Sequence, residues 1–178
     1  MSPLPTASQT VGPFFSIGLT ALCKADIECP GANGPRATIR GRVLDGDAQP
    51  VPDAILEVWQ VGDAGPRNET FPAGFARVAT NERGEFQFTT IKPEARCDAD
   101  GRVHAPHVAA LVFMRGLLRH LLTRIYFSNE AANAEDVALR LVPASRRYTL
   151  IATASAGGEE WRWDIHLQGE RETVFFEA

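Results

Sequence analysis

The sequence predicts an all-β fold: a β-sandwich of antiparallel or mixed sheets with little helix. Two observations predict it. Short segments that alternate apolar and polar residues follow one another along the chain, and this alternation is typical of strands with one buried face. Turn residues, mainly Gly, Pro, Asn and Asp, separate these segments at short intervals, which is typical of sandwiches and barrels. The chain has 178 residues, 44% of them hydrophobic, and fits one medium domain with a sizeable core.

The first 35 residues are predicted to form an extended arm that precedes the sandwich domain, residues 36–178. Thr10–Phe15 is a short apolar patch that Gly12-Pro13 interrupts, so no regular element is expected there. Phe14 and Phe15 need a surface to cover them, from this domain or from a neighbouring chain. The stretch up to Leu22 has no cationic start followed by an apolar run, so it is not a signal peptide.

The strands of the domain are expected in seven segments. They are residues 37–44, 54–60, 75–80, 85–90, 107–113, 147–154 and 160–167. The turn residues at 81–84 predict a hairpin between the third and fourth of them. Segment 117–127 stays ambiguous, because its leucines also suit one helical turn. Residues 129–141 indicate a short helix or a turn-rich excursion. Trp59 and Trp161 are predicted to lie in the core, and Trp163 in the core or at an interface.

Composition excludes several classes of protein. The formal net charge is -4 with no long basic stretch, which argues against nucleic-acid binding. No apolar run approaches the ~18 residues that span a membrane. Cys23, Cys29 and Cys97 show no metal-type spacing, and an odd number of cysteines is most simply explained by free thiols in a reducing cytoplasm. A Cys23–Cys29 bridge is the alternative. We expect a cytoplasmic protein.

No generic catalytic motif is present, such as G-x-S-x-G, a P-loop or H-E-x-x-H. His104 and His107 are the only close histidine pair. In an extended segment, residues three apart point to opposite faces. We therefore favour one solvated and one buried histidine over a metal site.

Several segments, in a fixed order, carry a resemblance to a known family. They are residues 39–43, 50–54, 56–60, 81–93 and 102–108. Together they resemble the intradiol ring-cleavage dioxygenases over nearly the whole chain. Within this family, residues 10–15, 115–118, 123–127 and 164–176 are similar to the alpha chain of heteromeric alpha/beta enzymes that act on protocatechuate. The resemblance implies a complex that uses O2 to open protocatechuate between its hydroxylated carbons, giving 3-carboxy-cis,cis-muconate.

The catalytic chains of this family bind Fe(III) with two tyrosines and two histidines, and here the chain departs from the pattern. It has only Tyr126 and Tyr148, and neither lies in the loops where the family's ligands occur, residues 61–74 and 93–101. Ala109 replaces the second histidine of the His-x-His motif, and only His107 remains. One imidazole does not hold iron. We expect no metal site and no catalytic residue on this chain, with Fe(III) held by a partner beta subunit.

The resemblance implies a supporting role in a substrate pocket at the subunit boundary. The arm, residues 1–35, would contact the beta subunit, and Thr10, Gly12 and Pro13 would line the pocket. Arg115 would bind the carboxylate of the substrate through charge-assisted hydrogen bonds. From local context alone, Gly12-Pro13 is only a turn and Arg115 is a strand-end arginine in water.

Two alternatives remain open from the residues. The chain could be a non-enzymatic transthyretin-like or carbohydrate-binding β-sandwich that shares only the fold. A standalone binding module has little need of an apolar Gly-Pro arm, whereas an obligate heteromer needs one. A self-sufficient enzyme with an unusual iron site is the third reading, and the small number of tyrosines argues against it.

Overall fold

A computed structural model of the chain describes residues 6–12, 14–29, 32, 34–60 and 73–177. Strands dominate it, and the prediction of an all-β fold with little helix is confirmed. The strands are β1 (Arg36–Leu44), β2 (Ile55–Trp59), β3 (Phe75–Ala79), β4 (Glu85–Ile91), β5 (Arg96–Cys97), β6 (Val103–His104), β7 (His107–Phe113), β8 (Leu121–Phe127), β9 (Ile151–Ala154), β10 (Glu160–Arg162) and β11 (Ile165–His166). The helical segments are α1 (Phe14–Thr20), η1 (Ala131–Ala134), α2 (Val137–Leu141) and η2 (Ala144–Leu150).

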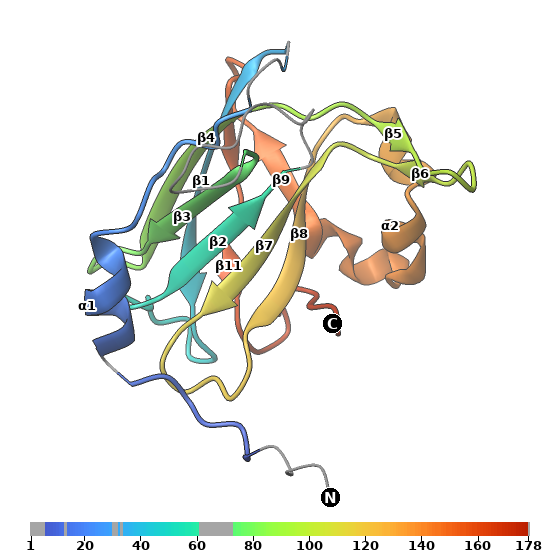
Figure 1. The fold of residues 1–178 in the computed structure, drawn as a ribbon. Coiled ribbons are helices and arrows are strands. Elements are labelled where there is room, and N and C mark those ends of the chain that lie inside the picture. The colour runs from blue at the N-terminus through green and yellow to red at the C-terminus, as the bar shows by residue number, and fades with distance from the viewer. Residues whose placement is uncertain (1–5, 13, 30–31, 33, 61–72, 178) are drawn as a thin grey trace, which may run out of the picture.

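Two layers of strands are joined through β9. In one layer β3, β2, β7 and β8 pair antiparallel in that order; they lie side by side in Figure 1, with β1 behind them. In the other, β1 pairs antiparallel with β4 and parallel with β10 and β11. β9 pairs parallel with β8 and antiparallel with β10, so nine of the described strands form one nearly closed sheet around the core, and β5 and β6 pair separately.

The core lies between the two layers, as the alternating burial of β1, β4 and β7 requires. Its fully buried members include Ile39, Leu56, Phe88, Val108, Ile125 and Phe127. Trp161 and Trp163 are buried as predicted. A second cluster, around Tyr126, Leu139 and Leu150, packs against η1 and includes residues of α2 and η2. Among the described residues, no helix combines the length and the apolar character needed to cross a bilayer.

The predicted hairpin between residues 75–80 and 85–90 is wrong. A turn does join β3 to β4, with Asn81 Oδ1 accepting the N–H groups of Arg83 (2.9 Å) and Glu85 (3.0 Å). However, β3 pairs with β2, and β4 pairs with β1 in the other layer. The chain therefore crosses from one layer to the other between β3 and β4. Alternation predicts strands and turns, but not which strands become neighbours.

The two last predicted strands are shorter than expected. Residues 144–150 form the 3-10 helix η2, so only residues 151–154 remain as strand. Segment 160–167 divides into β10 and β11, which keep the same register along β1. At the break, the Asp164 carboxylate accepts the backbone N–H of Arg42 at 3.0 Å. A side chain thus replaces a backbone partner, and the strand is interrupted there.

The arm differs from the prediction in one respect. No regular element was expected around Phe14, but the helix α1 begins at that residue. Farther along, Lys24 and Asp26 form β-bridges with Arg77 and Thr89, so the end of the arm pairs with β3 and β4.

The prediction that Trp59 lies in the core is also wrong. Its side chain is 39% exposed at the end of β2 and contacts Phe75, with ring centroids 4.4 Å apart.

Candidate functional site

Thr10 and Arg115 lie close together at one end of the molecule. The Thr10 hydroxyl accepts the backbone N–H of Gly116 at 2.7 Å, although the two residues are far apart in sequence. Gly116 has φ +91, a conformation that glycine adopts without steric cost, and it turns the chain between β7 and β8. In Figure 1 the arm, in dark blue, runs below this turn. One hydrogen bond therefore attaches the arm to the segment that carries Arg115.

The guanidinium of Arg115 pairs with Asp53, a partner that the sequence did not indicate. Arg115 Nε donates to Asp53 Oδ2. The Arg115 side chain is 55% exposed, and that of Asp53 is 19% exposed. Within the described part of the chain, the Nη1 and Nη2 atoms of Arg115 make no hydrogen bond. The terminal edge of this cation remains able to bind an anion.

Gly12 and Pro13 complete the predicted set. The Gly12 carbonyl accepts the N–H of Phe15 at 3.2 Å, at the start of α1. A Cβ atom at position 12 would meet nothing within 4 Å, so nothing in the described chain requires glycine there. Pro13 lies outside the described residues. Contact of these residues with a substrate stays a prediction.

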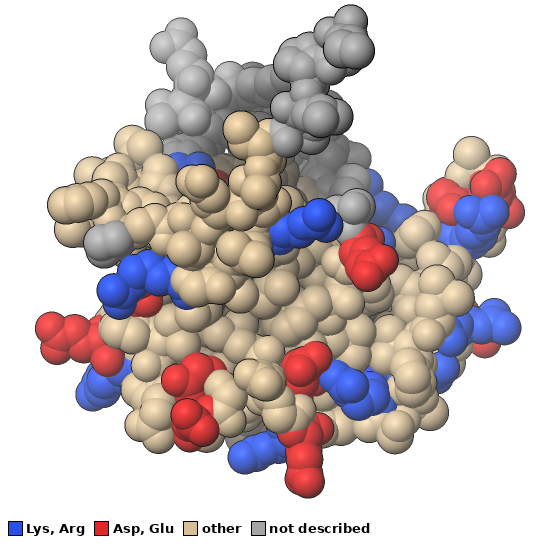
Figure 2. Space-filling model, turned by 90° about the horizontal axis from the view of Figure 1, so that it is seen from below, with Lys and Arg blue, Asp and Glu red and all other residues tan. Residues whose placement is uncertain are grey.

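Exposed apolar side chains follow Thr10 and Gly116 on the two segments that their hydrogen bond joins. Phe14 is 79% exposed and Ile17 is 70% exposed on α1, and Leu118 is 63% exposed just after Gly116. Figure 2 shows this end from below: acidic and basic side chains lie interspersed, with a broad uncharged area between them. Large exposed apolar side chains that cluster beside polar groups are typical of an interaction surface.

A second polar cluster occupies the region where the resemblance places a metal. His107 and Ala109 on β7 pair with Tyr126 and Arg124 on β8. Arg124 Nη1 lies 3.4 Å from the Tyr126 hydroxyl, which donates to Asp136 Oδ1 at 2.9 Å. His107 packs on Tyr126 with ring centroids 5.3 Å apart, and its Nδ1 lies 2.7 Å from the carbonyl oxygen of Ala105.

Asp136 anchors this cluster. Its buried carboxylate accepts the N–H groups of Ala138 and Leu139, each at 2.9 Å, as the N-cap of α2, and that of Ala105 at 2.8 Å. Burial by itself raises the pKa of Asp136, but these hydrogen bonds and the one from Tyr126 hold it below its usual value. Asp136 is therefore a carboxylate that is held by four donors, three on Oδ1 and one on Oδ2.

Of the two neighbouring rings, only that of Tyr126 has a pKa that opposes metal binding. Burial raises the pKa of Tyr126 well above its usual value, although the nearby Arg124 acts in the opposite direction. Tyr126 is therefore a neutral phenol, whereas Fe(III) needs the phenolate. Burial lowers the pKa of His107 and outweighs its hydrogen bond to Ala105; the charge of Arg124 lowers it further.

The residues present therefore do not fit Fe(III). One histidine is left, the phenol is protonated and already bonded, and a guanidinium lies beside them where a trivalent cation would be repelled. His104 adds no ligand set: its ring lies 6.5 Å from that of His107, and its Nε2 lies 3.4 Å from Asp98 Oδ2. No group of three or more His, Cys, Asp or Glu side chains is arranged for a metal among the described residues.

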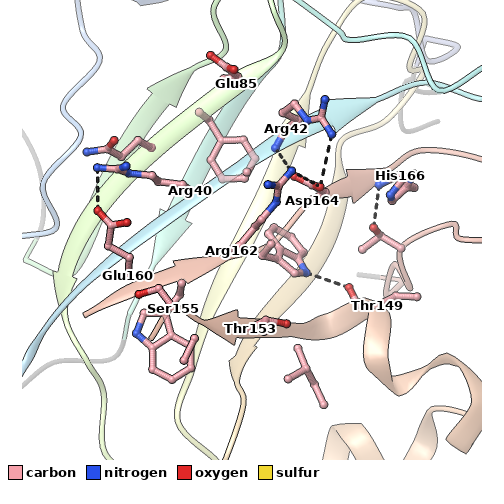
Figure 3. A pocket seen from close by; sticks show the side chains of 18 of the residues that line it. Arg40, Arg42, Glu85, Thr149, Thr153, Ser155, Glu160, Arg162, Asp164 and His166 are labelled. Atoms are coloured by element: carbon pink, nitrogen blue, oxygen red, sulfur yellow. Dashed lines mark hydrogen bonds and ion pairs between the residues drawn. The ribbon is translucent and has the colours of Figure 1, made fainter. Parts of the chain in front are cut away.

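A broad hollow of about 1290 Å³ lies on the outer face of β1, β4, β9 and β10. In Figure 3, Arg42 and Arg162 point toward Asp164, and Arg40 pairs with Glu160. The N···O distances are 3.9, 3.3 and 3.0 Å, respectively. Glu160 on β10 and Asp164 at the break between β10 and β11 lie among these three cations, so the hollow is not a site of one sign. None of the predicted site residues lines the hollow.

Comparison with known proteins assigns the chain to a family. The family model described as Dioxygenase (Dioxygenase_C) matches residues 12–169. The chain is 42% identical to the protocatechuate 3,4-dioxygenase alpha chain of Burkholderia cepacia, over 97% of both chains. It is 38% identical to the alpha chain of Pseudomonas putida, over 97% of this chain and 96% of that one. It is 29% identical to the beta chain of Burkholderia cepacia, over 79% of this chain and 67% of that one.

Solved structures agree on the fold. Hydroxyquinol 1,2-dioxygenase of Pseudomonas putida DLL-E4 superposes with a TM-score of 0.62 at 21% identity, over 81% of this chain; the match spans only 59% of that longer chain. The dioxygenase domain of a dioxygenase carbohydrate-binding fusion from Streptomyces sp. SirexAA-E gives 0.60 at 22%, over 82% of this chain and 88% of that one.

This chain belongs to the dioxygenase family. The expected resemblance is confirmed, and the alternative of a sandwich that shares only the fold is not supported. The family depends in general on Fe(III).

Sequence reasoning missed three residues of the two clusters: Asp53, Arg124 and Asp136. Arg124 lies in segment 123–127, which carries part of the resemblance, but no role was expected for its side chain; Asp136 lies in no such segment. The position of Asp53 could have indicated its contact with Arg115. Asp53 lies two residues before β2, and Arg115 lies two residues after β7. That indication requires the knowledge that β2 and β7 are paired.

Proposed function

We propose that this chain is the alpha subunit of a protocatechuate 3,4-dioxygenase, which assembles with a beta subunit. The complex cleaves protocatechuate between its two hydroxylated carbons and inserts both atoms of O2, giving 3-carboxy-cis,cis-muconate. The observation that carries this proposal is the identity of 42% and 38% to two alpha chains over 97% of this chain. The weaker match to a beta chain, at 29%, supports a paralogous partner.

The two subunits have different roles in the complex. Fe(III), held by the beta subunit, supplies the Lewis-acid and redox chemistry of ring cleavage. Support for this division comes from the network of Arg124, Tyr126 and Asp136, which fills the corresponding region of this chain. The alpha subunit therefore contributes to substrate binding and assembly.

Thr10, Gly12 and Pro13 form part of the pocket wall, and Arg115 binds the carboxylate of protocatechuate. The proposal for Arg115 is supported by its exposure and by the two Nη atoms that make no hydrogen bond in the described structure. Thr10 and Arg115 also lie on adjoining segments, through Gly116. A guanidinium binds a carboxylate with two parallel hydrogen bonds, which orients the ring as well as holding it.

The arm, residues 1–35, contacts the beta subunit. The apolar side chains of Phe14 and Ile17 support this, because they are exposed on α1 beside the pocket residues. Both side chains would be buried on association, which favours binding. We place the complex in the cytoplasm, in keeping with the free thiols of the three cysteines.

The test is to purify the chain alone and together with a beta subunit. Alone, it should contain no iron and cleave no protocatechuate. The complex should contain iron, show the burgundy colour of tyrosinate-to-Fe(III) charge transfer, and release the ring-opened product. Iron in stoichiometric amount in the isolated chain, or full activity of the beta subunit without it, would contradict the proposal. Iron content is measured by plasma emission and activity by O2 uptake.

A further inference from the structure

We propose that Asp53 is a positioning residue for substrate binding: it holds the Nε side of the Arg115 guanidinium, so that the Nη1 and Nη2 side faces the carboxylate of the aromatic substrate. This inference rests on the proposed function, because it takes Arg115 to be the group that binds this carboxylate. Asp53 itself touches no substrate and acts through Arg115.

The backbone places the two residues opposite each other. The antiparallel ladder of β2 and β7 ends with Ile55 paired to Phe113. Asp53 lies two residues before Ile55, and Arg115 lies two residues after Phe113. The ladder's register, continued past both strand ends, therefore brings Asp53 opposite Arg115, and an acid and a base that oppose each other across a ladder attract.

The turn that carries Asp53 is fixed by the core. The Thr80 hydroxyl donates to the carbonyl of Val51 at 2.8 Å and accepts the N–H of Ala54 at 3.0 Å. The N–H of Thr80 donates to the carbonyl of Ala54 at 2.9 Å. Thr80 is buried, so these bonds are shielded from water. Asp53 thus sits on a rigid support, and its side chain is only 19% exposed.

A guanidinium has one Nε–H and two Nη groups that point along different edges of a plane. The Nε donates to Asp53, which orients this plane. The edge formed by Nη1 and Nη2 keeps the geometry that a carboxylate needs for two parallel hydrogen bonds. The hydrogen bond to Asp53 restricts the rotamers of Arg115 before substrate binds. Less side-chain entropy is therefore lost on binding.

Asp53 also has an opposite effect, because its charge partly cancels that of Arg115. The sign of the change in KM separates the two effects. If Asp53 mainly positions Arg115, its removal weakens substrate binding and KM rises. If it mainly competes for the cation, its removal lowers KM.

The experiment measures KM and kcat of the alpha/beta complex for protocatechuate with D53A, D53N, R115A and the double variant D53A/R115A. R115A should raise KM about tenfold, as expected for the loss of a charge-assisted bond. D53A should raise KM about threefold, and D53N less, because the amide oxygen still accepts from Nε. In the R115A background, D53A should change nothing further, which a purely structural role would not produce. Catechol, which lacks the carboxylate, should show no effect of either substitution.

A matched control removes the same charge elsewhere. Asp100 forms an exposed ion pair with Arg102 at 3.4 Å. This pair lies in the loop before β6, and in Figure 1 β6 is far from the turn between β7 and β8. D100A should leave KM unchanged. Thermal unfolding of D53A should match that of the native complex.

The outcomes separate this inference from the proposed function. No effect of R115A on KM removes Arg115 from the pocket and contradicts that part of the proposed function. An effect of R115A with an unchanged or lowered KM for D53A overturns the positioning role alone. The same holds if D53A raises KM equally in the presence and absence of Arg115.

Discussion

The two polar clusters of this chain treat their charged groups in opposite ways. Around Asp136, the polar groups bond to one another inside the chain, with Tyr126, Ala105 and the start of α2 as donors. Around Arg115, the guanidinium has one partner among the described residues, Asp53, and stays half exposed. The first cluster is closed to any ligand. The second is open.

This difference indicates how a subunit can keep a fold and lose a metal. A buried metal site that loses its ligands leaves polar groups without partners, and each such group costs about 1–3 kcal/mol. In this chain, no side-chain N or O of Arg124, Tyr126, Asp136 or His107 is buried without a hydrogen-bond partner. An outer corner has no such cost, because water or a partner subunit satisfies its donors. The closed cluster should therefore govern stability, and the open one substrate affinity.

The largest expected effect is on stability, at Asp136. D136A leaves three backbone N–H groups and the Tyr126 hydroxyl without their acceptor, and it removes the N-cap of α2. We expect the free energy of unfolding of this subunit to fall by about 3 kcal/mol. Urea denaturation of the complex, followed by tryptophan fluorescence, measures this. KM of the complex that still folds should stay unchanged, and a large change in KM would break the separation of the two clusters.

The same residue gives a pH dependence. Because the folded state holds the pKa of Asp136 below its usual value, the stabilisation is fully present above the unfolded pKa of about 3.9. It is lost as the pH falls through the lowered folded pKa. Acid denaturation of the native complex should therefore show a proton uptake that D136N lacks. Identical acid transitions for the two proteins would contradict the assignment of a carboxylate to this cluster.

The open cluster should instead respond through subunit association. F14D places a charge on the exposed face of α1 and removes an apolar side chain that we expect to be buried against the beta subunit. The Kd of the complex should rise at least about tenfold, while the fold of the alpha subunit is unchanged. Analytical ultracentrifugation over a dilution series measures the Kd.

The matched control for this substitution is L141D. Leu141 is also strongly exposed, but it lies on α2, next to the closed cluster. An equal loss of association with L141D would show that the arm is not the distinctive contact, and the open cluster would lose its role in assembly.

Much of the fold was predictable from sequence, and the reason is local. Strands β1, β2, β3, β4 and β7 lie within one or two residues of the segments whose alternation predicted them, because burial of one face imposes a period of two. The pairing of β3 and β4 with different layers was not predictable, since the alternating pattern is the same for either arrangement. Trp59 illustrates a similar limit: its place at the end of β2 exposes it, although its size predicts burial.

The candidate site was predictable only in part. The resemblance to a family pointed to Thr10 and Arg115, and the structure brings their segments together. Asp53 and Asp136 were not found, because each acts through residues that are close only after folding, Arg115 for the first and Tyr126 for the second. Short-range sequence patterns carry no information on such pairs.

A smaller effect is expected at Thr10. T10V keeps the shape of the side chain but removes the acceptor for the Gly116 N–H. The bond is exposed, so stability should change by less than about 0.5 kcal/mol. We expect KM for protocatechuate to rise about twofold, because the arm is held less firmly beside Arg115. T10S, which keeps the hydroxyl, should behave as the native protein. If T10S raised KM as much as T10V, the hydrogen bond between Thr10 and Gly116 would not explain the effect.

The smallest expected effect tests the closed cluster directly. A109H restores the second histidine of the His-x-His motif on β7, opposite Arg124. Iron should still not bind, because the phenol of Tyr126 keeps its raised pKa and its bond to Asp136, and the guanidinium of Arg124 repels the metal. Plasma emission of the isolated subunit, and the absence of a visible charge-transfer band, measure the result. If A109H bound iron stoichiometrically, the missing histidine alone would account for the absence of a metal site. The hydrogen-bond network of Arg124, Tyr126 and Asp136 would then not prevent iron binding. If A109H/R124A bound iron where A109H did not, the repulsion by Arg124 would be the decisive barrier, and the network would act as a replacement for the metal's charge.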